Sequence, residues 1–149
     1  MPLDYLRLGG DAYRSLGRVH AYVAKALEPP LLALVYLRIS QINGCAYCVD
    51  LHWHEALQAG LEPRKLNLLA AWFESDAFAP RERVALAWAD ALTRLAGARP
   101  DEKLLGTVQQ EFGDQEAVDL TYAIAVMNAF NRLVGFQAHR STEGSNARA

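Results

Sequence analysis

The stretch QINGCAYCVDLHWHEAL, residues Gln41 to Leu57, contains both cysteines of the chain and a histidine four residues after the second. The apolar segment LLALVYLRISQI leads into it and ends at Asn43 and Gly44, two residue types that tolerate the left-handed conformation closing a helix. The cysteines therefore follow one helix and open another. A thioredoxin-like Cys-x-x-Cys would instead lie in a βαβ unit, so we expect an all-helical scaffold for these thiols.

The rest of the chain has the same helical pattern. Apolar residues recur at helical spacing between Gly and Pro residues, and the period-two alternation of strands is absent. Pro29 and Pro30 end the first segment, and Pro63 and Pro80 open two later ones. The sequence thus predicts an all-α, compact bundle of about six to seven helices. The expected segments are about residues 11–27, 31–42, 45–59, 64–75, 81–96, 101–112 and 114–137.

The length of 149 residues fits one domain, which we expect over residues 1–137. The small, polar residues of AHRSTEGSNARA predict a flexible tail over 138–149. The segment EAVDLTYAIAVMNAFNRLVGF is apolar around much of its circumference. Such a helix lies in the centre of a core or between subunits, so we also expect a homo-oligomer.

Charge and hydropathy exclude some partners. The formal charge is −2, from 15 basic and 17 acidic residues, with no Lys/Arg block to track a phosphate backbone, so we expect no nucleic-acid partner. The apolar runs are too short for a membrane span, and residues 1–20 have no apolar signal core. We therefore expect a cytoplasmic protein, in which a cysteine pair is more often catalytic or metal-binding than a structural cross-link.

The spacing of the two thiols and the histidine indicates one helix face. Cys45, Cys48 and His52 are separated by intervals of three, four and seven residues, so we expect the two sulfurs to lie close enough to bond. His54 and Asp50 should point elsewhere. A thiol in the first turn faces free backbone N–H groups and the positive end of the helix dipole, which favour the thiolate. A neighbouring imidazole can accept the thiol proton and return it to a leaving group.

Three other interpretations of the cysteines remain. A disulfide between Cys45 and Cys48 closes a very short loop, and it would stabilise the folded state by about 2 kcal/mol. A domain of this size does not depend on that contribution. A zinc site would have these thiolates and His52, but a closed site needs four ligands, and His20 and His139 lie in unrelated segments. We therefore expect no metal. Finally, free cysteine is often simply a small buried apolar residue.

Larger segments make the family recognisable. LRISQINGCAYCVDLH, followed by AAWFES and RERVALAWADALTR, resembles the AhpD-like alkylhydroperoxidase branch of the carboxymuconolactone decarboxylase family over about residues 30–135. The resemblance implies an all-helical subunit in trimers or hexamers, and a peroxidase without a cofactor. It also implies that Cys48 attacks the hydroperoxide, Cys45 then forms the disulfide, and His52 relays protons. Proximity to the helix dipole alone would favour Cys45 as the nucleophile.

The chain departs from the family at one position. The relay glutamate that the family has twelve residues before its first cysteine is here Ala33, and Glu28 lies beyond two prolines. We therefore expect weak reduction of hydrogen peroxide or alkyl hydroperoxides, with a lipoyl or thioredoxin-like protein as the dithiol electron donor. The alternative is a non-enzymatic oligomeric member that senses redox state or binds a ligand. A decarboxylase ranks third because its chemistry needs no thiol pair.

Several other side chains have two interpretations. Gln41 and Asn43 could form hydrogen bonds near the thiols or cap the preceding helix. Asn128 and Asn131, in an apolar helix, are expected to form helix–helix contacts. Aromatic residues at helical spacing are more often core or interface than pocket walls. The aromatic residues that could shape a hydroperoxide pocket are Tyr47, Trp53 and Trp72.

Overall fold

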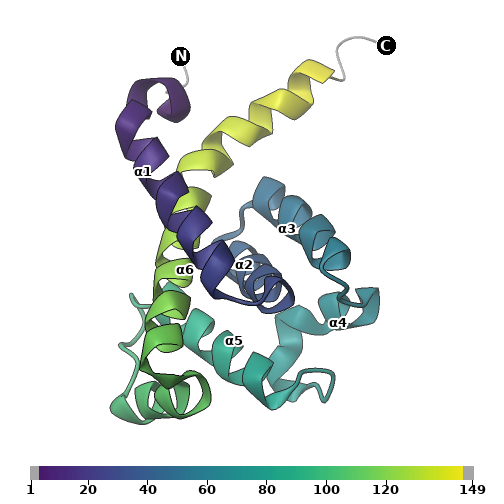
Figure 1. The fold of residues 1–149 in the computed structure, drawn as a ribbon. Coiled ribbons are helices and arrows are strands. Elements are labelled where there is room, and N and C mark those ends of the chain that lie inside the picture. The colour runs from purple at the N-terminus through teal and green to yellow at the C-terminus, as the bar shows by residue number, and fades with distance from the viewer. Residues whose placement is uncertain (1–3, 146–149) are drawn as a thin grey trace.

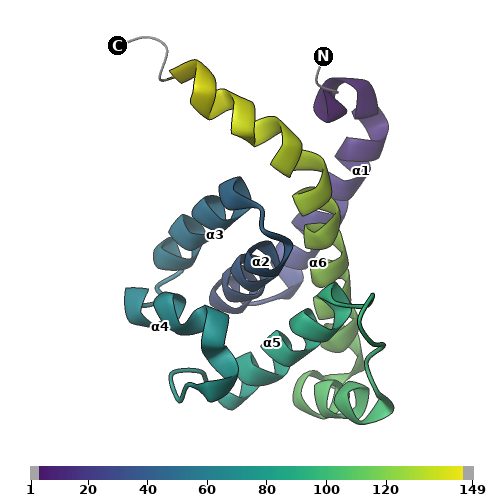
Figure 2. The same cartoon turned by 180° about the vertical axis from the view of Figure 1, so that it is seen from behind.

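Helix α2 (Pro29–Asn43) is the central element of the protein. In the computed structural model, which describes residues 4–145 and the side chains of 4–134, ten consecutive residues from Leu31 to Ser40 are buried. Figures 1 and 2 show α2 enclosed by the other helices, with α1 and α6 along one side and α3 on the other. A helix that is apolar around its circumference is stable only in such surroundings.

The predicted all-α fold is confirmed over residues 4–145, where no strand occurs. Pro29, Pro63 and Pro80 each begin a helix, at a position where a missing N–H costs nothing. The elements are α1 (Tyr5–Ala26), α2 (Pro29–Asn43), α3 (Ala46–Gln58), α4 (Pro63–Leu68), the 3-10 helix η1 (Leu69–Glu74), α5 (Pro80–Thr93) and α6 (Glu102–Ser145).

Some boundaries differ from the sequence prediction. Helix α1 begins six residues earlier than expected, because the Asp4 side chain accepts a hydrogen bond of 2.9 Å from the N–H of Arg7 and caps it. Gly10, with φ of 43°, kinks this helix. The segment predicted as one helix over 64–75 is divided into α4 and η1, and α5 ends at Thr93.

Helix α6 includes two segments that the sequence predicted as separate helices. Gly113 has φ of 71° and ψ of 168°, so the helix is interrupted where the prediction placed the boundary. The backbone is helical to Ser145, past residue 137, where we expected the last helix to end. Residues 146–149 of the expected flexible tail lie outside the described residues, and its flexibility stays a prediction.

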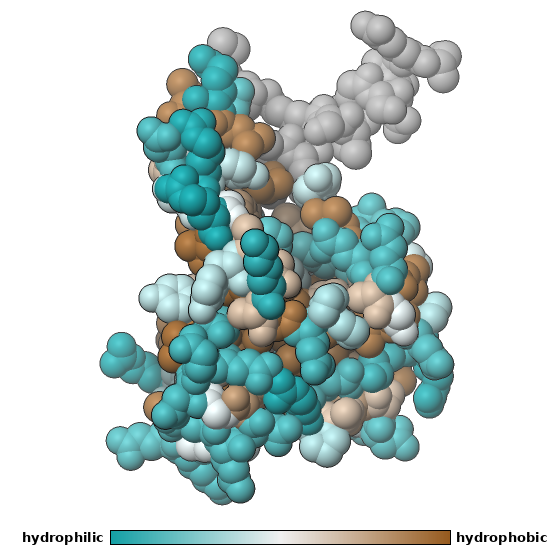
Figure 3. All heavy atoms as spheres, in the orientation of Figure 1, coloured by the Kyte–Doolittle hydropathy of each residue, from teal (hydrophilic) through white to brown (hydrophobic). Residues whose placement is uncertain are grey.

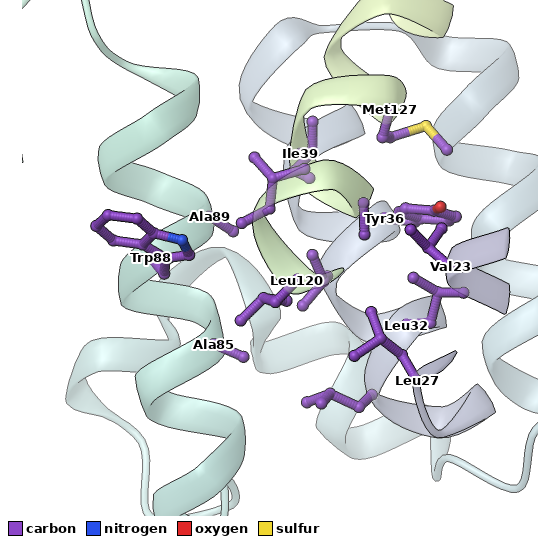
Figure 4. Close-up of a cluster of buried hydrophobic side chains, with 14 of the residues drawn as sticks. Val23, Leu27, Leu32, Tyr36, Ile39, Ala85, Trp88, Ala89, Leu120 and Met127 are labelled. Carbon is purple, nitrogen blue, oxygen red and sulfur yellow. The ribbon is translucent and has the colours of Figure 1, made fainter. Parts of the chain in front are cut away.

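Two apolar clusters meet at α2. The first lies between α1, α2, α5 and α6 and includes Leu32, Tyr36 and Ile39 (Figure 4). The second joins α2 to α3, α4, η1 and α5, and includes Leu34 and Leu37, which are completely buried. Each fully buried leucine contributes roughly 1.5–3 kcal/mol. Helix α2 is therefore fixed from both sides, and so is the cysteine turn that follows it.

Polar side chains cover most of the face shown in Figure 3, with scattered apolar residues between them. Among the helices described, none combines the length and the hydropathy that crossing a membrane requires.

Candidate active site

The turn between α2 and α3 positions the first cysteine. Gly44 has φ of 67°, in the left-handed region, and its N–H donates to Gln41 O at 3.3 Å. The N–H of Cys45 donates to Ser40 O at 3.1 Å. This closure is a usual helix ending with glycine after the last turn, and it confirms the predicted boundary. Cys45 becomes the N-cap of α3.

The two sulfurs form a disulfide. The Sγ of Cys45 also accepts a hydrogen bond from the N–H of Cys48 at 3.3 Å, and the two Cα atoms are 5.3 Å apart. Both residues are buried, at 6% and 4% exposure. The predicted proximity of the sulfurs is thus confirmed, while their catalytic role stays a prediction.

A cavity of about 240 Å³ lies against the cysteine face of α3. Cys48 lines it, and Tyr47 and Leu51 stand at its wall with half or nearly half of their surface exposed. Helices α1 and α6 also contribute to the wall. The other lining residues are Tyr13, His20, His52, Glu55, Met127, Phe130 and Val134.

His52 is held by a carboxylate that the sequence interpretation missed. Its Nδ1 lies 2.7 Å from Oε2 of Glu55, whose side chain is 48% exposed, whereas that of His52 is 6% exposed. A carboxylate can only accept, so Nδ1 carries the proton and Nε2 of the neutral ring is a free base. The signal for Glu55 was its position seven residues after Cys48 and three after His52, on the same face.

Burial is the largest influence on His52. It lowers the pKa of His52 below the ordinary histidine value, while the hydrogen bond to Glu55 and its negative charge raise it in part. A charge on His20 would lower the pKa of His52 further. At neutral pH the imidazole of His52 is therefore uncharged and able to accept a proton.

The sequence interpretation placed His20 in a segment unrelated to the cysteines. This was wrong, because His20 lines the same cavity as Cys48 and His52. Helix α1 packs along α6, and its residue His20 lines the cavity. Its Nδ1 lies 3.2 Å from the hydroxyl of Tyr36, and the two rings stack with centroids 5.6 Å apart. The Tyr36 ring is also 5.3 Å from that of His52. His139 lies outside the residues whose side chains are described.

Ala33 does not supply a polar group. It is 7% exposed and belongs to the apolar cluster that includes Leu37 and Ala56. Glu28 is exposed at the N-terminus of α2. Asp50 lies 3.6 Å from His54 on the exposed side of α3, as the spacing predicted. The carboxylate that contacts His52 thus comes from α3 and not from α2.

The other candidates divide between the cavity and the core. Tyr47 lines the cavity, but Trp53 and Trp72 pack against the second apolar cluster. The amide of Asn43 donates to Oδ1 of Asn128 at 3.0 Å and of Asn131 at 2.9 Å. These bonds tie the end of α2 to α6 and confirm the predicted helix–helix contacts.

Both thiols are engaged in the disulfide, and among the residues with described side chains no group of three His, Cys, Asp or Glu residues has a geometry that could hold a metal ion.

Comparison with known proteins identifies a family and two relatives that are similar to this chain. The profile of the carboxymuconolactone decarboxylase family matches residues 10–91. The chain is 33% identical over 100 residues to the uncharacterized protein YdfG of Bacillus subtilis (strain 168), covering 67% of this chain and 68% of YdfG. It is 30% identical over 102 residues to the uncharacterized protein YnjA of Escherichia coli (strain K12), covering 68% of this chain and 56% of YnjA.

A crystal structure shares the fold. It is that of a protein of unknown function from Agrobacterium tumefaciens, described as a candidate antioxidant defence protein AhpD. The two structures superpose with a TM-score of 0.84 and 35% sequence identity, covering 91% of this chain and 94% of the other.

Proposed function

Because the chain belongs to the carboxymuconolactone decarboxylase family, in its AhpD-like branch, we propose that it is a thiol-dependent peroxidase reducing hydrogen peroxide or alkyl hydroperoxides. The observation that carries the proposal is the Cys45–Cys48 pair, with Cys48 on the wall of the cavity that His52 also lines. The antioxidant role suggested for the Agrobacterium tumefaciens relative agrees with it.

The proposed cycle transfers two electrons from the dithiol to the peroxide. The Cys48 thiolate attacks the terminal peroxide oxygen, an S–O bond forms, and the O–O bond breaks to release an alkoxide, which takes a proton to become the alcohol. The Cys45 thiol then loses its proton and attacks the sulfur of the Cys48 sulfenic acid; the S–S bond forms, the S–O bond breaks, and the departing hydroxide takes that proton to become water. A dithiol donor reduces this disulfide by thiol exchange.

Access favours Cys48 over Cys45 as the first nucleophile. Cys48 lines the cavity, whereas Cys45 is the N-cap residue, with its sulfur directed at the backbone of the first turn. A Cys45 thiolate at that place would be stabilised by the N–H of Cys48 and the helix dipole, which suits a resolving thiol.

His52 and Glu55 supply the proton transfer. The free Nε2 of His52 takes the thiol proton and returns it to the alkoxide, while Glu55 fixes the tautomer and stabilises the imidazolium. The Glu55 side chain is 48% exposed, so water weakens its electrostatic effect. We therefore propose that the activity is weak.

The alternative proposal is an oligomeric member that senses redox state or binds a ligand. The apolar surroundings of Ala33, which leave no carboxylate on α2 near His52, favour it. Turnover separates the two: with a dithiol donor supplied, an enzyme consumes many equivalents of peroxide rapidly, a redox sensor is oxidised and regenerated slowly, and a ligand-binding member consumes none.

We also propose that the chain forms a homo-oligomer, a trimer or hexamer. Tyr22 of α1 and Val118 and Tyr122 of α6 are apolar and about half exposed, and a second copy could cover them. A monomeric mass by light scattering at micromolar concentration would contradict this. The donor is proposed to be a lipoyl or thioredoxin-like protein.

The test is a thiol titration of the reduced protein before and after one equivalent of cumene hydroperoxide. We expect rapid loss of two thiols and their recovery with dithiothreitol. Cys48→Ser should lose no thiol rapidly, and Cys45→Ser should accumulate a sulfenic acid that dimedone traps. If Cys48→Ser reacts as fast as the unaltered protein, the proposed function is wrong.

A further inference from the structure

We propose that His20 is a catalytic residue that donates a hydrogen bond from Nε2–H to the leaving oxygen of the hydroperoxide, and that Tyr36 positions it for this. The inference rests on the proposed peroxidase function and adds to it a residue from α1, a helix that otherwise contributes nothing to the cycle.

The position of His20 is defined by the rings around it. It lines the cavity that contains Cys48 and His52. Its ring stacks on Tyr36 at 5.6 Å and meets Phe130 edge-on at 6.2 Å. One ring stacked on the imidazole at an interplanar angle of 30° and a second ring at 90° to it restrict its rotation. His20 is therefore held in one orientation at the wall of the cavity in which peroxide would meet Cys48.

The hydroxyl of Tyr36 determines which nitrogen of His20 carries the proton. Tyr36 is 2% exposed, and Nδ1 of His20, at 3.2 Å, is the hydrogen-bond partner of its hydroxyl among the described residues. A buried O–H without an acceptor is costly, so the hydroxyl donates and Nδ1 accepts. Burial raises the pKa of Tyr36 far above the ordinary tyrosine value, which keeps this donor protonated. The neutral His20 ring then has its hydrogen on Nε2.

The two imidazoles at the cavity thus have opposite tautomers. Glu55 accepts from Nδ1–H of His52 and leaves Nε2 of His52 as a base. Tyr36 donates to Nδ1 of His20 and leaves Nε2–H of His20 as a donor. Thiol oxidation by a peroxide needs one group of each kind: a base for the thiol proton, and a donor where negative charge develops.

The role of His20 in the step is electrostatic. As the S–O bond forms and the O–O bond breaks, the electron pair moves to the alkoxide oxygen, and the His20 N–H stabilises it without giving up its proton. The proton that completes the alcohol is the one that His52 took from the Cys48 thiol. The benefit of such a donor grows with the charge that the leaving oxygen bears, so it depends on the peroxide.

This dependence on the peroxide distinguishes a catalytic role of His20 from a structural one, because a structural role would lower the rate equally with every peroxide. tert-Butyl hydroperoxide releases a strongly basic alkoxide, whereas peracetic acid releases acetate, whose charge is delocalised and needs little help. The rates of thiol oxidation of the reduced protein are measured with both peroxides for His20→Phe, which keeps an aromatic ring, and His20→Gln, which keeps an N–H donor. His54→Phe, at an exposed histidine outside the cavity, is the matched control.

We expect His20→Phe to lose roughly a hundredfold in rate with tert-butyl hydroperoxide, the lower end of the loss on removal of an oxyanion donor, because the cavity is open to water. The loss with peracetic acid should be several-fold smaller, and His20→Gln should recover part of the rate. Alkylation of Cys48 by iodoacetamide, which involves no leaving oxygen, should be unchanged. Tyr36→Phe, which removes only the hydroxyl, should give an intermediate loss with the same dependence on the peroxide.

Two results would overturn the role of His20. One is an unchanged rate with tert-butyl hydroperoxide in His20→Phe, and the other is an equal loss with both peroxides and with iodoacetamide. Neither touches the proposed function as long as Cys48→Ser abolishes rapid thiol oxidation. If Cys48→Ser retains the rate, the peroxidase proposal fails first, and the role of His20 fails with it.

Discussion

Two polar clusters, Arg38–Asp90 and His52–Glu55, differ in how many of their polar atoms are paired. Between α2 and α5, Arg38 donates from Nε and Nη2 to the two carboxylate oxygens of Asp90, at 2.7 and 2.8 Å. Trp72 donates to the same carboxylate at 3.3 Å. On α3, His52 has one bond to Glu55, and its Nε2 has no partner among the described residues.

The difference separates stability from chemistry. A buried ion pair with all its donors and acceptors satisfied holds helices together, and its groups are not free to meet a ligand. A buried imidazole with one free nitrogen at a cavity is less well satisfied and can transfer a proton. Substitutions in the Arg38–Asp90 pair should therefore affect stability, and those in the His52–Glu55 pair should affect the rate of thiol oxidation.

The largest expected effect is that of His52→Ala on the reaction rate. Loss of general acid–base assistance costs about 10²- to 10⁴-fold, and we expect the lower end because water can enter the cavity and replace the imidazole in part. Stopped-flow measurement of thiol oxidation by cumene hydroperoxide checks this. His54→Ala, on the exposed side of the same helix, should react like the unaltered protein. Equal rates for both variants would make His52 a structural residue.

The converse prediction concerns Asp90→Asn. It leaves the Arg38 guanidinium, whose side chain is 7% exposed, without its counterion. Breaking a buried pair in this way costs about 3 to 5 kcal/mol, and we expect the lower end because the Asp90 side chain is 22% exposed. Urea denaturation measures the loss of unfolding free energy.

Two comparisons complete this test. Asp11→Asn, in the exposed pair with Arg14, should have no measurable effect on stability. The rate of thiol oxidation of folded Asp90→Asn should equal that of the unaltered protein. A slower reaction without a loss of stability would mean that the Arg38–Asp90 pair serves the active site, and the contrast between the two clusters would be wrong.

The sequence predicted the features that depend on neighbouring residues. Prolines at helix starts, Gly44 after α2 and the change at Gly113 all act locally, and the spacing of Cys45 and Cys48 needs only one helix turn. The same helical spacing places Glu55 on the face of His52, although the sequence interpretation considered only the positions of Ala33, Glu28 and Asp50 for the carboxylate.

What the sequence could not predict depends on tertiary packing. His20 on α1 and Tyr36 on α2 are 16 residues apart and meet only in the folded chain. Arg38 and Asp90 are 52 residues apart. The spacing of residues within one helix does not identify the residue on another helix that a side chain will contact. The same polar side chains are also compatible with a helix face exposed to solvent. Pairings between helices were therefore the part of the site that only the structure revealed.

A smaller effect is expected for the pH dependence of folding. Burial keeps the pKa of His52 in the folded protein below the value of about 6.5 that a histidine has in an unfolded chain. Between these two values the unfolded state binds more protons, so the unfolding free energy falls as the pH falls through about 6.5 and levels off below the folded pKa. Urea midpoints of the oxidised protein between pH 8 and pH 5 measure it. His52→Gln should flatten the curve, and His54→Gln should not.

The smallest effect should come from Glu55→Gln, because this carboxylate is half exposed and acts on peroxide only through His52. The amide oxygen can still accept from Nδ1–H, so the tautomer is kept and only the negative charge is lost. Glu55 raises the pKa of His52, and its removal should move the His52 limb of the rate profile to lower pH. With a weaker base, the rate at neutral pH should fall by less than about tenfold, because a half-exposed carboxylate contributes less than the ~1.5–3 kcal/mol of a buried hydrogen bond to a charged group. Asp50→Asn, an equal charge change on the exposed side of α3, is the control. If both variants shift the pH profile equally, the net charge of the helix matters and the contact between Glu55 and His52 does not.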